Sequence, residues 1–123
     1  MYTYNMTIRR PLSPVILHIL LALGDLDRHG YEIMKQVGID SGGSVRLAAG
    51  TLYDAIHRLV LAGLLVESEE RPAPEHDDSR RRYYKLTESG RRLLADEIAS
   101  LEAIVTIGST RLRQSETMRG ALA

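Results

Sequence analysis

Cysteine, phenylalanine and tryptophan are all absent from the 123 residues of this chain, so six tyrosines are its only aromatic side chains. Without cysteine there are no disulfides, no thiolate metal ligands and no cysteine nucleophile, which fits a reducing compartment. A long apolar run is lacking too, because residues 15–23 are interrupted by His18 and are too few to span a bilayer. We therefore expect a cytoplasmic protein without a membrane partner.

Clusters of chemically reactive side chains are also lacking. The four histidines are scattered, and the segment Glu75-His76-Asp77-Asp78 has no second group of ligands to complete a metal site. The sequence has no Ser-His-Asp spacing, no phosphate-binding loop and no pair of carboxylates in an apolar segment. We expect no enzymatic activity, no metal and no cofactor.

An excess of either charge is missing as well, since sixteen basic residues stand against sixteen acidic ones. Binding to nucleic acid needs local cations rather than a basic total, so the distribution decides. Residues 79–87 contain four bases and no acid, whereas residues 67–78 contain six acids and one base. A basic strand beside an acidic loop is compatible with a DNA-contacting ribbon.

Hydrophobic periodicity divides the chain into a small body and one long helix. Residues 1–12 show no period and are expected to form an N-terminal arm. Residues 13–87 fit a winged helix-turn-helix, a DNA-binding architecture that is mainly α with a small β-wing. Residues 88–115 fit a long dimerisation helix, and residues 116–123 a flexible tail.

The first two helices of the body have recognisable ends. One begins at Ser13-Pro14, with Ser as N-cap and Pro at the first helical position, and ends near Gly24. The next spans about residues 29–37 and ends at Gly38. The Gly- and Ser-rich residues 40–47 alternate around Arg46, which allows one short strand. The second helix is expected to bury Tyr31, Ile33, Met34 and Val37.

The third helix, about residues 48–62, has the pattern of a DNA recognition helix. At about 100° per residue, its apolar residues fall on one side, and small, polar and basic residues on the other. Ala48 and Ala49 provide no capping side chain, so the N–H groups of the first turn bind either water or the preceding loop, or a DNA phosphate. The residues that cluster on the apolar side are Leu52, Ile56, Leu59, Val60 and Gly63. The candidate DNA contacts are Gly50, Thr51, Tyr53, Asp54, His57 and Arg58.

These candidates differ in the part of DNA that they can contact. The hydroxyls of Thr51 and Tyr53 can donate to phosphate oxygens, which positions a protein on DNA without reading the sequence. Asp54, His57 and Arg58 can meet base edges, with Arg directed to guanine and Asp to the N4 amino group of cytosine. The alternatives are that Tyr53 packs on the wing and that His57 and Arg58 belong to a solvated face.

Two short apolar strands, residues 64–66 and 83–86, predict a β-hairpin whose polar, proline-containing connection forms the wing loop. Successive side chains alternate along a strand, so Arg80 and Arg82 share one side and Arg81 lies on the other. Arg82 is the best placed of the three to contact DNA, and a solvated run of charge is the alternative. The candidate wing contacts are Arg80, Arg82 and Lys85.

The last helix carries an apolar seam. Thr87 is its expected N-cap, and apolar residues then recur at alternating intervals of four and three, the heptad spacing of packed helices. The seam is longer than a small body can cover, so part of it needs a second copy of the chain. The expected dimer contacts are Ile16, Leu20, Leu94, Ile98, Leu101, Val105 and Leu112.

Four blocks of sequence together carry a family resemblance. They are HGYEI from His29, GTLYDAIHRL from Gly50, GLL from Gly63 and RRYYKLTESG from Arg81. In this order and spacing, over about residues 13–95, they closely resemble the PadR-like transcriptional regulators.

The resemblance implies a winged-helix DNA-binding protein of the short branch, which dimerises through a single C-terminal helix and usually represses transcription. It places Thr51 and Tyr53 at positions that touch DNA phosphates. Many members respond to phenolic acids or to hydrophobic drug-like compounds. Short members that bind drugs stack flat ligands on a Trp of the last helix, which this chain lacks, and Ala48-Ala49 stands where relatives often have Ser-Pro.

We therefore predict a homodimeric, sequence-specific DNA-binding repressor that reads a palindromic operator. A small hydrophobic or phenolic effector is expected between the last and the N-terminal helices of the dimer, and a filled core without an effector is the alternative. The competing function is a winged-helix module for protein–protein interaction that does not read DNA. The expected lining of the effector site is Ile16, Leu20, Ile98, Leu101 and Val105.

Overall fold

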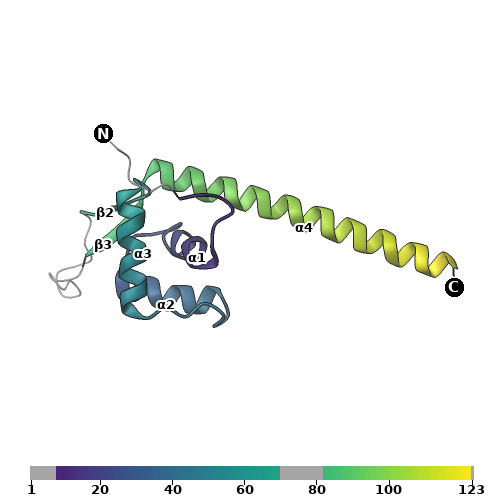
Figure 1. Cartoon of the computed structure of the whole chain (residues 1–123), viewed down its shortest axis with the longest axis horizontal. Helices are drawn as coiled ribbons and strands as arrows, with labels where there is room; N and C mark the ends of the chain where they lie inside the picture. The colour runs from purple at the N-terminus through teal and green to yellow at the C-terminus, as the bar shows by residue number, and fades with distance from the viewer. Residues whose placement is uncertain (1–7, 70–81, 123) are drawn as a thin grey trace.

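The structure, a computed structural model, describes residues 8–69 and 82–122. Figure 1 shows a small body at one end of a single long helix, most of which extends away from that body. This architecture is mainly helical with a small antiparallel sheet, as predicted. In chain order the elements are α1 (Pro14–Ala22), β1 (Arg28–His29), α2 (Gly30–Asp40), α3 (Ala49–Leu61), β2 (Leu65–Glu67), β3 (Tyr83–Leu86) and α4 (Glu88–Leu122).

Helices α1 and α2 begin where a side chain caps them. At α1, the Ser13 hydroxyl accepts a hydrogen bond from the Ile16 N–H (3.3 Å), and Pro14 takes the first helical position as predicted. At α2 the cap is His29, whose Nδ1 accepts from the Glu32 N–H (3.3 Å), while the Glu32 carboxylate accepts from the His29 N–H (3.1 Å). This reciprocal pair is a capping box built on histidine.

Helix α2 is longer than predicted and buries a narrower face. It continues past Gly38 to Asp40, and its fully buried large side chains are Ile33 and Val37, one turn apart. The prediction that Tyr31 is buried is wrong, since that residue is 57% exposed. Tyr31 lies on nearly the opposite side of the helix from Ile33, so it cannot share the face that packs on α1 and α3.

The sheet has three antiparallel strands in the order β1-β3-β2. In the central strand, Tyr84 lies opposite Arg28 on one side and opposite Glu67 on the other. The sequence pattern did not predict β1, because two residues are too few to show an alternation. The strand predicted around Arg46 does not form; the Ser41 hydroxyl instead accepts from the Val45 N–H (3.0 Å) and holds this segment in a turn.

The core is aliphatic, and tyrosine supplies its aromatic part. Tyr83 and Tyr84 are both buried, although only one of them was expected there. Tyr84 belongs to the main core cluster, whereas Tyr83 lies opposite His29 of β1. The Tyr83 ring meets His29 edge-on, with 5.2 Å between the ring centroids. Val60, on the apolar side of α3, is 37% exposed. The largest fully buried side chains are Ile19, Leu20, Leu23, Ile33, Leu52, Leu59, Leu65 and Val37.

Thr87 fixes the start of α4, as predicted. Its hydroxyl donates to the Gly63 carbonyl (2.6 Å) and accepts from the Gly90 N–H (3.0 Å). Gly90 sits so close to the Leu64 backbone that a Cβ there would lie 3.1 Å from the Leu64 carbonyl carbon. This approach joins the first turn of α4 to the end of α3 and the start of β2.

The predicted end of α4 at residue 115 is wrong. The helix continues to Leu122, so residues 116–122, predicted as a flexible tail, are helical. The apolar seam stops at Leu112, but the residues after it include the good helix formers Arg113, Gln114, Glu116 and Met118 and no proline. Among the described helices, none is both long and apolar enough to cross a membrane.

The part of the arm that the structure describes is fixed to α4 by Glu97. The Glu97 carboxylate is buried and accepts from the Arg10 guanidinium (2.9 Å) and from the Leu12 N–H (3.0 Å). Arg10 also donates to the Asp96 carbonyl (2.9 Å) and to the Ser100 hydroxyl. The hydrogen bond from Arg10 and then that from Leu12 hold the pKa of Glu97 below its usual value. Sequence patterning missed this contact; residues 1–7 lie outside the described range.

Candidate nucleic-acid interface

Helix α3 presents its polar side to solvent. All six residues predicted there as DNA contacts are exposed, and Tyr53 is 49% exposed. The N-cap residue, Ala48, makes no side-chain hydrogen bond, as the sequence predicts. A Cβ built on Gly50 would have no neighbour within 4 Å, so the first turn of α3 is open to close approach. The exposed predicted contacts on α3 are Gly50, Thr51, Tyr53, Asp54, His57 and Arg58.

Tyr53 is held by the start of α2. A Cβ built on Gly30 would lie 2.6 Å from Cζ and 2.8 Å from Cε1 of the Tyr53 ring, so the ring occupies the space above this glycine. The alternative prediction for Tyr53 was that it packs on the wing. The structure instead places its ring against Gly30. Because the residue stays half-exposed, packing and contact with an external partner are compatible.

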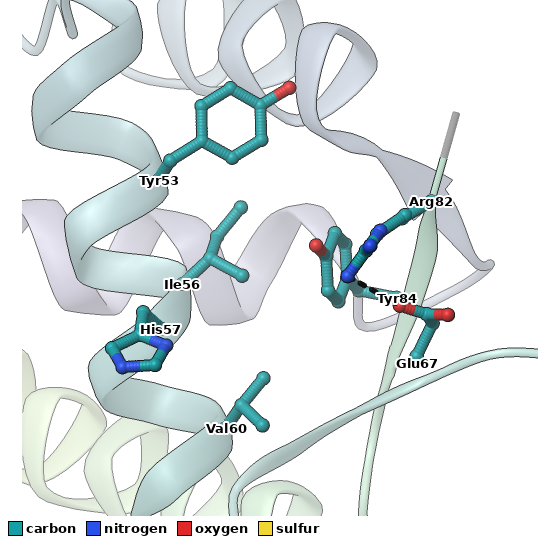
Figure 2. A pocket seen from close by; sticks show the side chains of 7 residues that line it. All are labelled: Tyr53, Ile56, His57, Val60, Glu67, Arg82 and Tyr84. Atoms are coloured by element: carbon teal, nitrogen blue, oxygen red, sulfur yellow. Dashed lines mark ion pairs between the residues drawn. The ribbon is translucent and has the colours of Figure 1, made fainter. Parts of the chain in front are cut away.

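A groove of about 260 Å³ separates α3 from the wing strands (Figure 2). Ile56 from α3 and Tyr84 from β3 form its buried floor. Burial raises the pKa of the Tyr84 hydroxyl, and the nearby Glu67 carboxylate raises it further. The hydroxyl is therefore neutral at physiological pH. The residues that line the groove are Tyr53, Ile56, His57, Val60, Glu67, Arg82 and Tyr84.

Of the basic residues predicted to contact DNA from the wing, Arg82 lies at this groove and Lys85 does not. Arg82 lines the groove, and its Nη1 lies 3.7 Å from Oε2 of Glu67. Lys85 is exposed but is paired with Val66, one residue out of phase with Tyr84, so it lies on the other face of the ribbon. Arg80, the third predicted contact, lies outside the described residues. The predicted cluster is thus only partly assembled, with Arg82 as its described member beside α3.

Three of the residues predicted at the dimer interface belong to the core of the single chain. Leu20 has no exposed surface, Ile16 is 6% exposed and Leu94 is 7% exposed. The prediction that they are dimer contacts is wrong. Ile16 and Leu20 of α1 are packed inside the single chain. The heptad spacing that included Leu94 defines one face of α4, but it does not separate the part that the body covers from the part that projects. Leu94 packs near Gly24 of the same chain.

The outer part of the seam is exposed. Val105 is 64% exposed and Leu112 69% exposed, while Ile98 and Leu101 are more than one-third exposed. A shallow hollow of about 560 Å³ lies along this stretch of α4. Figure 1 shows that this part of the helix extends beyond the body. Within the described chain, the hollow is lined by Ile98, Leu101, Glu102, Val105 and Thr106.

The sequence profile of the transcriptional regulator PadR-like family matches residues 16–96, which include most of α1, the rest of the winged body and the start of α4. The chain belongs to this family. It is 38% identical over 92 residues to the transcriptional regulator Rv3488 of Mycobacterium tuberculosis, an alignment that covers 75% of this chain and 79% of that protein. The resemblance inferred from the four sequence blocks is therefore confirmed.

Solved structures agree with this membership of the PadR-like family. A PadR family transcription regulator from Clostridium difficile is 26% identical, with a TM-score of 0.63, over 81% of this chain and 99% of that chain. A complex structure of RosR, a protein of H. salinarum, is 27% identical, with a TM-score of 0.65, over 89% of both chains. The winged-helix assignment thus rests on the fold as well as on the sequence.

Sequence reasoning about this PadR-like chain missed two residues of the site. Gly30 was part of a matching block, but no pattern indicated that an aromatic ring covers it. Glu67 was counted with the acidic wing loop, whereas it is the last residue of β2 and lies opposite Tyr84. A correct register between β2 and β3 would have placed it beside Arg82.

Proposed function

We propose that this PadR-like transcriptional regulator is a homodimeric, sequence-specific DNA-binding repressor. The observation that carries the proposal is the exposed polar face of α3 beside a wing strand that directs Arg82 to the same groove. An uncapped helix start and an open Gly50 allow DNA to approach α3 closely. The proposed arrangement places α3 in the major groove and the wing along the backbone.

Each exposed residue of this face has a proposed role. Thr51 and Tyr53 donate to phosphates, and the packing of Tyr53 on Gly30 fixes the direction of its hydroxyl. Asp54, His57 and Arg58 meet base edges. Arg82 contacts a phosphate next to the groove, whereas Lys85 reaches a phosphate only from the other face of the ribbon. Arg80 is proposed as a further wing contact on the strength of the sequence alone.

Dimerisation is proposed through the outer seam of α4. An α-helix of 35 residues is about 50 Å long, and the winged body covers only its first turns. The apolar side chains beyond the body would remain in water in a single chain, which favours pairing with a second copy. Two copies related by a twofold axis present two α3 helices, so the proposed operator is palindromic. The proposed contacts are Ile98, Leu101, Val105 and Leu112.

A small hydrophobic or phenolic effector is proposed at this interface. The hollow along α4 supplies an apolar surface at the position where two copies would meet. Ile16 and Leu20, predicted to line this site, are buried in the core of the single chain and do not reach it. A ligand bound here would favour one spacing of the two α3 helices and would release DNA if that spacing does not fit the operator.

The test is a mobility-shift titration of the protein with the duplex upstream of its own gene and with random duplex of the same length, at several salt concentrations. We expect tighter binding to the upstream duplex and weaker binding as salt rises, because phosphate contacts release counterions. Sedimentation should give a dimer both free and bound. Equal affinity for both duplexes would refute sequence-specific reading, and no binding to either would favour the protein-interaction module.

A further inference from the structure

An ion pair closes the wing side of the groove shown in Figure 2. It joins Nη1 of Arg82 to Oε2 of Glu67 over 3.7 Å, and the dashed line marks it. Both side chains remain accessible, with 72% of the Arg82 side chain and 48% of the Glu67 side chain exposed. The pair can therefore open without disturbing the core.

The register of the hairpin makes this pair. Glu67 lies directly opposite Tyr84 in the β2–β3 ladder, and Arg82 precedes Tyr84 by two positions in the chain. Side chains two positions apart on a strand share a face, so Arg82 is a diagonal neighbour of Glu67. Both side chains line the groove between the wing strands and α3, as Tyr84 does.

The groove has one acidic and one strongly basic side chain, and they bind each other. Among the seven described residues that line it, Glu67 is the only acid and Arg82 is the only Lys or Arg. A backbone phosphate that entered this groove would be attracted by the Arg82 guanidinium and repelled by the Glu67 carboxylate. The two groups lie less than 4 Å from each other. Ile56 and Val60 of α3 face the ion pair across the groove, and with Tyr84 they offer apolar surface to a deoxyribose.

We infer that Glu67 is an intramolecular competitor for Arg82, occupying the guanidinium in the free protein until a DNA phosphate displaces it. The inference rests on the DNA-binding function proposed above. Glu67 acts through Arg82, so it is a positioning residue that does not itself bind DNA. Its effect is to reduce affinity for DNA backbone of any sequence, because a phosphate contact carries no base information.

The size of the effect follows from the exposure of the pair. Exposed ion pairs are weak, and losing this one should change affinity by about two- to fivefold. Glu67→Gln keeps the size and hydrogen-bonding capacity of the side chain but removes its charge. We expect the variant to bind random duplex and upstream duplex more tightly by the same factor, with a steeper dependence on salt.

The matched control is Glu116→Gln. It removes the same charge from an exposed position in the last two turns of α4. Figure 1 shows the C-terminal end of α4 far from the wing strands. Screening over such a distance leaves little effect on the groove, so its affinity should match that of the unmodified protein at physiological salt. Thermal unfolding of both variants should stay close to the unmodified protein, since neither side chain is buried.

A double-mutant cycle separates competition for Arg82 from general charge repulsion. In an Arg82→Gln background, Glu67→Gln should give little further gain, because no guanidinium remains to be released. The same gain in both backgrounds would show that Glu67 acts by repulsion alone and would overturn the inference. A loss of affinity in Glu67→Gln would overturn it too, since Glu67 would then be aiming Arg82 at DNA.

The outcome also distinguishes this inference from the proposed function. If the unmodified protein binds no duplex at low salt, DNA binding itself fails. If it binds duplex and Glu67→Gln leaves affinity and salt dependence unchanged, only the competitor role fails. Thermal unfolding that drops sharply in Glu67→Gln would assign the ion pair a structural role instead, and would likewise contradict it.

Discussion

The ring of Tyr53 on α3 lies directly over Gly30, the first residue of α2, and leaves no room there for a side chain. A Cβ at Gly30 would be 2.6 Å from Cζ of the ring, far inside van der Waals contact. The two helices of the helix-turn-helix are thus set against each other by a glycine and an aromatic ring. The same contact holds the Tyr53 hydroxyl at the edge of the groove in Figure 2.

Gly30→Ala should therefore destabilise the protein and weaken DNA binding together. The added methyl group must displace the ring, and such overpacking costs about 1–3 kcal/mol. Thermal unfolding and duplex affinity are the measurements. The matched control is Gly38→Ala in the same helix, where a Cβ meets nothing within 4 Å and should raise stability by about 0.5–1 kcal/mol. Equal effects of the two substitutions would contradict the role given to the Tyr53–Gly30 contact.

Replacing Arg82 by Ala and replacing Arg58 by Ala should weaken DNA binding in different ways. Arg82→Ala should weaken binding to every duplex and reduce the salt slope by about one charge, because its proposed partner is a phosphate. Arg58→Ala should cost about 1–3 kcal/mol on the operator and little on random duplex, because its proposed partner is a base edge. Titrations on both duplexes at three salt concentrations measure this. A uniform loss for Arg58→Ala would remove it from the base contacts.

Glu97 predicts an acid-sensitive contact between the arm and α4. Its pKa is lowered in the folded chain, chiefly by the Arg10 hydrogen bond, so the ionised form stabilises the fold at pH values above its usual pKa of 4.5. That stabilisation is lost as pH falls through the lower, folded-state value. Glu97→Gln should lower the unfolding temperature at pH 7 and flatten its decline between neutral and acid pH.

The control for the Glu97 prediction is Glu116→Gln, an exposed carboxylate on the same helix, outside the lining of the hollow. Its unfolding temperature should follow the unmodified protein across the pH range. Arg10→Ala should reproduce the loss at pH 7, because it removes the first of the two donors to Glu97. An unchanged decline with acid in Glu97→Gln would show that the contact does not contribute to stability.

The ends and faces of several elements could be predicted from the sequence because they depend on local chemistry. Ser13-Pro14 and Thr87 are capping signals that act within one turn, and both mark helix starts in the structure. The cap of α2 could not be predicted in the same way, because His29 is an uncommon cap whose ring is fixed by Glu32 and Tyr83. The exposed face of α3 followed from a strong helical period.

What the sequence could not supply depends on distant parts of the chain. The seam of α4 has one period throughout, yet Leu94 is buried by the body and Val105 is exposed, and the difference is where the body ends. The Arg82–Glu67 pair depends on a strand register that spans the wing loop. In both cases the residue types were visible, but their partners were set by tertiary structure.

Charge placed on the outer seam should dissociate the proposed dimer. Val105→Glu would bury an unpaired carboxylate between two α4 helices, at a cost of several kcal/mol that should weaken dimerisation by more than about 100-fold. Sedimentation over a range of concentrations gives the dissociation constant. Ala103→Glu is the matched control, since this exposed residue lies on the opposite side of α4 and should leave the dimer intact. Equal dissociation by both would exclude the seam as the interface.

The effector should bind along the same stretch of α4. Calorimetric titration with phenolic acids and with planar cationic drugs would detect it, and Leu101→Ala, which removes part of the hollow's lining, should weaken binding. The chain has neither Trp nor Phe, so planar dyes lack an indole to stack on and should bind more weakly than aliphatic or small phenolic ligands. Addition of a ligand that binds should also release the upstream duplex if, as proposed, it changes the spacing of the two α3 helices. Tight binding of a planar dye that Leu101→Ala leaves unchanged would place the site elsewhere in the molecule.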